Sequence, residues 1–298
     1  MNTEITFAIP FYRGLDYLRE AVESVLAQER EGWRLLVCDD SGNAESGAGD
    51  LVSAYADPRI RYHRSTQNLG MVANWNLCLD LAESDLVTLL HADDALLPGY
   101  AGLMGDLADR HSGAAACFCA ARIVDDEGRE RPSMADTVKG FFSPSGPDEM
   151  CLEGEPALRA LMAGNFIMCP TLCYRKSRLG ARRFWQGWKQ VQDLELTSRL
   201  LMDGEQLVGT REVAYTYRRH AESATQIQSE SMLRFDEEFE LFDRVAERAE
   251  ALGWKPAARV SRRKRILRLH LLYRALRELG RGRVGASASH LRYLISRT

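Results

Sequence analysis

Two pairs of adjacent aspartates follow short apolar runs that are typical of buried strands. Asp39 and Asp40 come after residues 33–38, and Asp93 and Asp94 come after residues 86–90. In open α/β sheets, ligands bind outside the carboxyl ends of the strands, where carboxylate oxygens suit a divalent cation that bridges to phosphate. A lone aspartate pair could instead cap the following helix. The second pair favours the cation interpretation.

Alternating strands and helices must position these carboxylates. We expect strands at 5–10, 33–38, 59–63, 86–90 and 114–124, with helices at 15–28, before Pro58, at 68–82 and at 100–110. This order predicts a mostly parallel sheet with helices on both faces and right-handed crossovers. The polar 59–63 strand suits a sheet edge. Neither a Gly-x-Gly-x-x-Gly fingerprint nor a P-loop occurs, so a bound phosphate would need a metal.

The second half of the chain has a less regular pattern. Residues 125–150 are interpreted as a surface loop, and a mobile flap is one form it could take. We predict helices at 154–163, 193–202, 232–252, 257–280 and 286–297, and strands at 166–174, 206–208 and 213–219. The chain is accordingly divided into a catalytic domain, 1–225, and a helical C-terminal appendage, 226–298, that is basic from about residue 259.

Composition indicates an ordinary globular protein of 298 residues, 45% hydrophobic and 27% charged. It lacks an apolar run of membrane-spanning length and a signal-peptide pattern, so a cytoplasmic location is expected. Seven cysteines, odd in number and without paired CxxC spacing, are interpreted as reduced and mostly buried.

The C-terminal segment 259–298 is strongly basic. It holds eleven arginines and Lys264 against one acid, Glu278, although the whole chain has a net charge of −3. A helical stripe accompanies the charge: Ile266, Leu269, Leu272, Tyr273, Leu276 and Leu279. One interpretation is a helix packed on the catalytic domain with its arginines solvated or paired. The other is a peripheral contact with an anionic membrane surface. Nucleic-acid binding is disfavoured because no binding motif accompanies the charge.

Taken together, the motifs resemble family 2 glycosyltransferases of the GT-A fold, a Rossmann-like arrangement, over roughly residues 4–225. The matching segments are Ile9-Pro-Phe-Tyr12, Val37-Cys-Asp-Asp-Ser-Gly42, Asn68-Leu-Gly-Met-Val-Ala-Asn74, His91-Ala-Asp-Asp94, Gln192-Asp193, and Tyr217-Arg-Arg-His220 with Ser223 and Thr225. Each motif alone is weak, but six in the family's order are hard to produce by chance.

The resemblance implies a nucleotide-sugar site. Asp39 is similar to the carboxylate that accepts a hydrogen bond from the nucleotide base, and Asp93 resembles the acid near the ribose and metal. The remaining residues implied for nucleotide-sugar binding are Pro10, Phe11 and Tyr12, which would wall the base, and Asn68, Gly70 and Asn74.

The resemblance also implies Mg²⁺ or Mn²⁺ as cofactor. Asp94 would be the direct ligand, with Asp93 beside it, and His220 resembles a histidine that completes the metal or diphosphate site in some members; a loop histidine held by backbone contacts is the alternative. This chain departs from many relatives at His91, where they carry an aspartate. Arg218 and Arg219 could clamp phosphate, but they point to opposite faces of a strand, so at most one would do so.

Asp193 resembles the family's catalytic base, which takes a proton from the acceptor hydroxyl in a single displacement that inverts the anomeric configuration. An N-cap or first-turn acid favoured by the helix dipole is the alternative. Glu195 is a second candidate base that would point away from the side of Asp193. The QxxRW pattern of processive synthases is absent, so transfer of one sugar per binding event is expected.

The function expected from these residues is transfer of a sugar from a UDP-, dTDP- or GDP-linked donor to a saccharide or lipid-linked acceptor, as in bacterial surface polysaccharide synthesis. Acceptor choice is expected in 125–170 and the tail. A catalytically silent, nucleotide-binding or partner-docking subunit is the alternative from a different class. A nucleotidyltransferase would need a basic, glycine-rich loop after the first strand, and only Arg13 and Gly14 are present. Location on the inner face of the membrane would follow from a membrane-binding tail.

Overall fold

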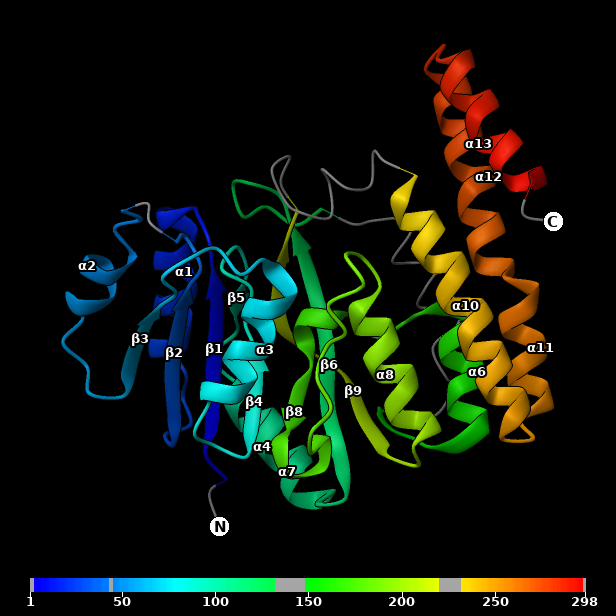
Figure 1. The fold of residues 1–298 in the computed structure, drawn as a ribbon. Helices are drawn as coiled ribbons and strands as arrows, with labels where there is room; N and C mark the ends of the chain where they lie inside the picture. The colour runs from blue at the N-terminus through cyan, green and yellow to red at the C-terminus, as the bar shows by residue number, and fades with distance from the viewer. Residues whose placement is uncertain (1–2, 43–44, 132–147, 220–231, 297–298) are drawn as a thin grey trace.

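The computed structural model describes residues 3–42, 45–131, 148–219 and 232–296. Figure 1 shows a single twisted sheet with helices on both sides and a C-terminal group of helices at one end. Within these residues the sheet has nine strands, in the order β3-β2-β1-β4-β8-β6-β9-β5, with β7 paired to β9. Six strands run in one direction, and β5, β7 and β8 run in the other. The predicted mixed, mostly parallel sheet is therefore confirmed.

The N-terminal half of the sheet consists of parallel strands joined by helices. Its strands are β1 (Ile5–Phe11), β2 (Trp33–Asp39), β3 (Ile60–Arg64) and β4 (Leu86–Leu89), and its helices are α1 (Leu15–Leu26), α2 (Ala48–Ser53) and α3 (Met71–Leu81). The half-exposed β3 forms the outer edge, as its polar sequence predicts. β4 is buried along its whole length because both of its sides are paired and both of its faces are covered.

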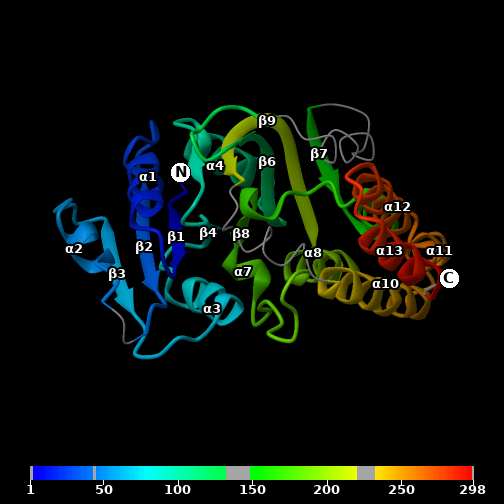
Figure 2. The same cartoon turned by 90° about the horizontal axis from the view of Figure 1, so that it is seen from above.

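Alternate residues of the central strands face two different apolar cores. Phe7 and Ile9 pack with α1 and with α4 (Tyr100–Arg110), whereas Ala8 packs with α3 on the other face. Figure 2 shows α1 and α4 on one side of the sheet and α3 on the other. Burial on both faces is what a nearly continuous apolar run in a parallel strand predicts.

The other half of the sheet is less regular than its sequence suggests. It contains β5 (Ala95–Leu96), β6 (Ala114–Val124), β7 (Glu149–Leu152), β8 (Cys173–Arg175) and β9 (Gln206–Arg218), with α6 (Gly154–Gly164) and α7 (Lys176–Leu179). The predicted strand 166–174 is wrong over most of its length, because the 3₁₀ turn η1 (Cys169–Thr171) precedes a three-residue strand. Pro170 lies within that turn and has no N–H to donate to a sheet.

The two strands predicted at 206–208 and 213–219 are one long strand, β9. Its middle, which is polar and contains a glycine, remains paired with β7 through Gly209 and Thr210. A Cβ at Gly209 would lie 2.1 Å from the ring of Phe118, so the missing side chain allows β6 and β9 to pack closely. Of the loop predicted at 125–150, the structure describes a turn closed by pairing of Val124 with Glu130 and the start of β7; residues 132–147 lie outside the described residues.

The described residues after the sheet form the helices α10 (Leu233–Ala251), α11 (Lys255–Arg263), α12 (Arg265–Gly280) and α13 (Val284–Ser296). Lys264 has a left-handed backbone, with φ of 47°, and it divides the predicted helix 257–280 into α11 and α12. Buried side chains of α10 share a core with α6 and with α8 (Gln192–Met202). Described residues on either side of the predicted boundary thus share one apolar core, and the division into two domains stays a prediction.

The predicted apolar stripe of the tail lies on the outside of α12. Leu269, Leu272, Tyr273, Leu276 and Leu279 are 40–60% exposed, whereas Leu267, Leu271 and Ala275 on the opposite face are at most 5% exposed. The interpretation of a helix packed on the catalytic domain is confirmed for α12, since Leu267 and Leu271 share the core with α6 and α8, but the predicted stripe itself, except for the half-buried Ile266, faces solvent. Within the described ranges, no helix combines the length and the apolar character that crossing a bilayer would require.

Candidate active site

Asp39 ends β2 and is fully buried as an ionised acceptor of three hydrogen bonds. Its Oδ1 accepts from the N–H of Ser41 at 2.9 Å, and its Oδ2 accepts from the hydroxyl of Tyr62 at 2.6 Å and from that of Ser46. Burial would raise the pKa of Asp39, but these hydrogen bonds outweigh it and hold the pKa below its ordinary value. Burial and the bond to Asp39 raise the pKa of Tyr62 to about 12. Asp39 is therefore a fixed negative acceptor at the strand end.

Asp40, its neighbour, organises the turn that leads into α3. Its two carboxylate oxygens accept from the N–H groups of Leu69 at 2.7 Å and Gly70 at 2.9 Å. The side-chain amide of Asn68 donates to the Asp40 carbonyl at 2.8 Å. Gly70 has φ of 86°, which favours glycine. The second aspartate of this pair thus supports the loop instead of facing a ligand.

Asn74 joins the ends of the two central strands. It is 3% exposed, and its amide donates to the carbonyl of Cys38 at 3.1 Å and to that of Phe11 at 3.5 Å. Its two N–H donors are thus used to hold the edge on which a nucleotide would rest. The predicted ligand-binding roles of Asn68, Gly70 and Asn74 stay predictions, and the structure adds a supporting role for each.

Pro10, Phe11 and Tyr12 differ in their access to solvent. Phe11 is 1% exposed and belongs to the core beneath α1, whereas Tyr12 is 56% exposed. The Phe11 carbonyl accepts from the N–H of Asp40 at 2.8 Å, which ties this segment to the end of β2. Tyr12 and the half-buried Pro10 thus have side-chain surface open to solvent, and the predicted contact of this segment with a base stays a prediction.

Asp94 is buried directly after β4. Its Oδ2 accepts from the hydroxyl of Tyr215 at 2.9 Å, and its Oδ1 accepts from the backbone N–H of Arg218 at 2.8 Å. Burial and the nearby charge of Asp93 raise the pKa of Asp94 well above its ordinary range, although these two hydrogen bonds lower it. Each oxygen retains a second lone pair, so the carboxylate can still bind a cation.

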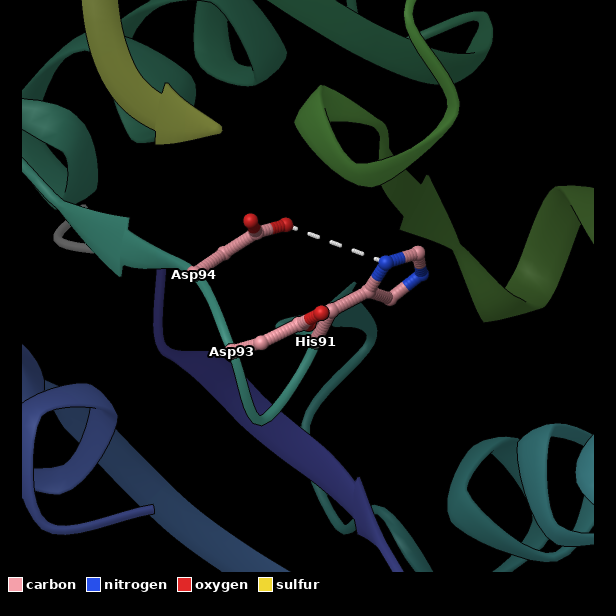
Figure 3. A group of neighbouring side chains, drawn as sticks. All are labelled: His91, Asp93 and Asp94. Atoms are coloured by element: carbon pink, nitrogen blue, oxygen red, sulfur yellow. Dashed lines mark ion pairs between the residues drawn. The ribbon is translucent and has the colours of Figure 1, made fainter. Parts of the chain in front are cut away.

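His91 and Asp93 complete a group with Asp94. One ligand atom from each lies within 4.8 Å of the others, and His91 Nδ1 is 3.8 Å from Asp94 Oδ2. Figure 3 shows the three side chains on one turn, with the imidazole directed toward the Asp94 carboxylate. The His91 ring stacks on Trp75 with centroids 5.2 Å apart. Burial lowers the pKa of His91, although the charges of Asp93 and Asp193 oppose this, so the imidazole offers a neutral nitrogen.

This donor set fits a divalent cation. Two carboxylates suit Mg²⁺ or Mn²⁺, and a bound cation would compensate the cost of keeping the buried Asp94 ionised. A neutral imidazole is a better ligand for transition-metal ions than for Mg²⁺. The predicted ligand His220 lies outside the described residues, so its role stays a prediction.

Asp193 is the second residue of α8. The N-cap position belongs to Val191, which has no capping side chain, so Asp193 is a first-turn acid and not the N-cap. Its charge acts on the imidazole of His91 and raises the pKa of the buried Cys169 thiol, after burial itself. Asp193 therefore lies near His91, about a hundred residues earlier in the sequence, and its role as the base stays a prediction.

Glu195, the alternative base, is bound elsewhere. Its carboxylate pairs with Arg199, with Nε to Oε1 at 2.8 Å and Nη2 to Oε2 at 3.1 Å. It lines a small cavity with Trp185 and Trp188, away from the group around His91. These contacts support the prediction that Asp193 is the better candidate.

Glu237 was not predicted, and it positions the start of α8. This α10 side chain is 7% exposed and accepts from the N–H of Lys189 at 3.0 Å and of Gln190 at 2.7 Å. Those two residues come just before α8, so α10 fixes the segment that carries Asp193. No local sequence signal indicates such a contact, because 47 residues separate Glu237 from Gln190.

Arg218 holds the loop of Asp93 instead of facing outward. Its guanidinium donates to the carbonyls of Asp93 at 3.1 Å and Asp126 at 3.0 Å, and it pairs with Glu20. It is 6% exposed, so it is poorly placed to clamp a phosphate. Arg219 lies with its guanidinium 5.6 Å from the ring of Tyr217.

The fold and this site define a GT-A protein. The model of the glycosyl transferase family 2 matches residues 6–161, more than half of the chain, so the chain belongs to that family.

Curated relatives match shorter segments. The chain is 30% identical over 126 residues to the succinoglycan biosynthesis protein ExoO of Rhizobium meliloti (strain 1021), covering 42% of this chain and 35% of that protein. It is 29% identical over 97 residues to the putative colanic acid biosynthesis glycosyl transferase WcaA of Escherichia coli (strain K12), covering 33% of this chain and 35% of that protein. The matches thus span about a third of these relatives' length.

Solved structures share the fold at low identity. TarS of S. aureus in complex with UDP-GlcNAc has a TM-score of 0.63 and 16% identity, over 83% of this chain and 66% of that one. The mannosyltransferase PcManGT of Pyrobaculum calidifontis, in complex with GDP-Man and Mn²⁺, has a TM-score of 0.59 and 15% identity, over 100% of this chain and 86% of that one. The predicted GT-A fold is confirmed.

Proposed function

We propose that this protein is an inverting, metal-dependent glycosyltransferase. It moves one sugar from a UDP-, dTDP- or GDP-linked donor to a hydroxyl of a saccharide or lipid-linked acceptor. The observation that carries the proposal is the group of His91, Asp93 and Asp94 beyond the carboxyl end of β4, with Asp193 close enough for its charge to act on the His91 imidazole. The names of the polysaccharide-synthesis relatives support surface polysaccharide as the product class.

The donor is held by residues at the ends of β1 and β2. Asp39 is ionised and accepts a hydrogen bond from a ring N–H of the base, a group that uracil, thymine and guanine all carry. Tyr12 packs its exposed ring against that base. Because Asp39 is fixed by Tyr62, Ser46 and Ser41, it keeps its orientation when the donor leaves.

The donor diphosphate would lie beside Asp93 and Asp94, which with His91 would hold Mg²⁺ or Mn²⁺. The cation, when bound, neutralises the charge that develops on the leaving nucleoside diphosphate. The hydrogen bonds of Tyr215 and Arg218 keep the Asp94 carboxylate fixed, so little reorganisation is needed during the reaction.

Asp193 acts on the acceptor. Its carboxylate takes the proton from the acceptor hydroxyl as that oxygen attacks the anomeric carbon, while the bond from this carbon to the diphosphate oxygen breaks. Attack opposite the leaving group inverts the anomeric configuration. A positioned base of this kind contributes about 10²- to 10⁴-fold in rate.

The test is nucleoside diphosphate release from a panel of UDP-, GDP- and dTDP-sugars with Mn²⁺, using wild type, Asp193→Asn and Glu195→Gln. We expect Asp193→Asn to lower the rate by about 10²-fold or more with donor affinity retained. Glu195→Gln should keep most of the activity. Equal rates for wild type and Asp193→Asn would overturn the assignment of the base.

A further inference from the structure

A stripe of large apolar side chains faces solvent along α12. Leu269, Leu272, Leu276 and Leu279 recur at intervals of three or four residues, so they lie on one face of the helix, and each is at least 40% exposed. Single exposed leucines are common on protein surfaces, but a continuous row of them marks a contact site. On the adjoining α13, Ile295 is also exposed, at 74%.

Basic residues surround this stripe without matching acids. The segment 265–296 contains seven arginines and one acid, Glu278. That carboxylate already has the guanidinium groups of Arg277, Arg281 and Arg283 within 3.9 Å. Glu278 is therefore already shared among three arginines of the segment.

The preceding helix shows the opposite arrangement. On α11, Arg262 pairs with Glu250, and Lys264 at its end pairs with Asp243. Acidic residues of α10 thus neutralise part of the charge at α11. The described residues offer Arg265, Arg268 and Arg292 no ion pair of this kind, so the positive charge concentrates where the apolar stripe is.

A basic groove lies next to the start of the stripe. It has a volume of about 620 Å³, and its lining includes Arg259, Arg263, Arg265 and Arg268, while Glu250 is the one acid in it. Guanidinium groups in such a concave site suit phosphate oxygens. The stripe and the groove together present apolar and anion-binding surface side by side.

The hairpin of α12 and α13 is accessible from outside. Figure 1 shows the two helices side by side, extending past the body of the molecule on the side of the sheet where β1 ends, and Figure 2 places them at the molecule's edge. Nothing else among the described elements covers the stripe, since its members are 40–60% exposed.

We propose that this α12–α13 face docks on an anionic lipid bilayer, with its leucines in the interfacial region and its arginines on lipid phosphates. The proposal rests on the proposed function in one respect, since it would bring the enzyme to a lipid-linked acceptor. A two-fold dimer through this face would place like charges opposite one another. Nucleic acid would provide phosphates for the arginines but would leave the leucine stripe exposed to water. A bilayer with anionic headgroups satisfies both.

The test is sedimentation of the full chain with vesicles of phosphatidylcholine alone or mixed with phosphatidylglycerol. We expect binding to the anionic vesicles that weakens in high salt. Leu269→Glu with Leu276→Glu should lower it by about tenfold or more, because two anchors are lost and two like charges added. The control is Leu252→Glu, which alters another exposed leucine, at the end of α10.

A charge series separates the arginines from the stripe. Arg265→Gln, Arg268→Gln and Arg292→Gln together should lower binding by about a hundredfold, whereas the same change at the exposed Arg19, Arg131 and Arg159 should have a much smaller effect. Equal sedimentation of wild type and the leucine variant, or no sedimentation of wild type, would overturn the proposal. So would a wild-type dimer that the leucine variant converts to a monomer without any vesicle binding. Donor binding, measured without vesicles, distinguishes this failure from failure of the proposed function.

Discussion

The parallel half of the sheet and the C-terminal helices differ in how well the sequence predicts which apolar side chains are buried. In β1, β2 and β4, every apolar residue except Pro10 is buried, because neighbouring strands and two helical layers enclose it. In α12, apolar residues occupy two faces, and only one of them is buried. Periodicity alone identifies a helix as amphipathic, but it does not identify the packed face when both faces carry leucine.

The largest expected effect tests this difference between the faces of α12. Leu271→Asp places a charge in a fully buried position and should destabilise the protein by about 3 kcal/mol or more. Leu276→Asp, on the exposed stripe, should change stability by less than about 0.5 kcal/mol. Urea unfolding of both variants measures the contrast. Equal losses would mean that the stripe is buried in solution.

The second prediction concerns Glu237, which joins α10 of the C-terminal helices to the segment before α8. Glu237→Ala removes the acceptor of two backbone N–H groups before α8 and should lower kcat by about tenfold or more by misplacing Asp193. The dissociation constant of the donor nucleotide should change little.

Two variants on the same helix control this experiment. Glu237→Gln retains one carbonyl acceptor and should recover part of the rate, and Glu240→Ala alters an exposed acid of α10 and should have no effect. If Glu237→Ala weakened donor binding as much as it lowered kcat, the contact would have a general structural role.

A third prediction concerns which cation binds at His91, beside the parallel half of the sheet. An imidazole ligand favours Mn²⁺ over Mg²⁺ relative to a carboxylate. His91→Asp should therefore reduce the preference for Mn²⁺ over Mg²⁺ by about tenfold, measured by calorimetry of metal-dependent nucleotide binding. His91→Gln, which removes the imidazole, should weaken nucleotide binding more in the presence of Mn²⁺ than in the presence of Mg²⁺. Identical metal preference in all three proteins would show that His91 does not bind the cation.

The smallest effect is expected at Tyr62. Tyr62→Phe removes one hydrogen bond to Asp39 and should cost about 1 kcal/mol at pH 7. Since the folded pKa of Asp39 lies below its ordinary 3.8, its stabilising contribution is present above that value and is lost as the pH falls through the folded pKa. The stability difference between Tyr62→Phe and wild type should thus narrow below about pH 4. A constant difference from pH 7 to pH 3 would contradict this.

The sequence predicted the site best where a chemically active side chain directly follows a buried strand. Asp39 and Asp94 follow buried strands, so their position at one sheet edge could be predicted from the strand pattern alone. The neighbouring carboxylates were harder to interpret, because the supporting role of Asp40 depends on the backbone of residues 69–70. Contacts of this range, like those of Glu237 and Tyr215, leave no periodic signal. The 3₁₀ turn at Cys169–Thr171 and the continuous β9 were missed for the same reason: pairing partners distant in sequence determine them.

The measurement that most directly tests the central claim is calorimetric titration of UDP, GDP and dTDP in the presence of Mn²⁺ and then of chelator. It should compare wild type with Asp94→Asn, and with Asp80→Asn as a control outside the site. A nucleotide site at the carboxyl ends of β1, β2 and β4 predicts that one nucleotide binds with Mn²⁺, that chelator weakens it, and that Asp94→Asn alone of the two variants does the same. Failure of all three nucleotides to bind would contradict the enzyme assignment and favour a catalytically silent, partner-docking subunit.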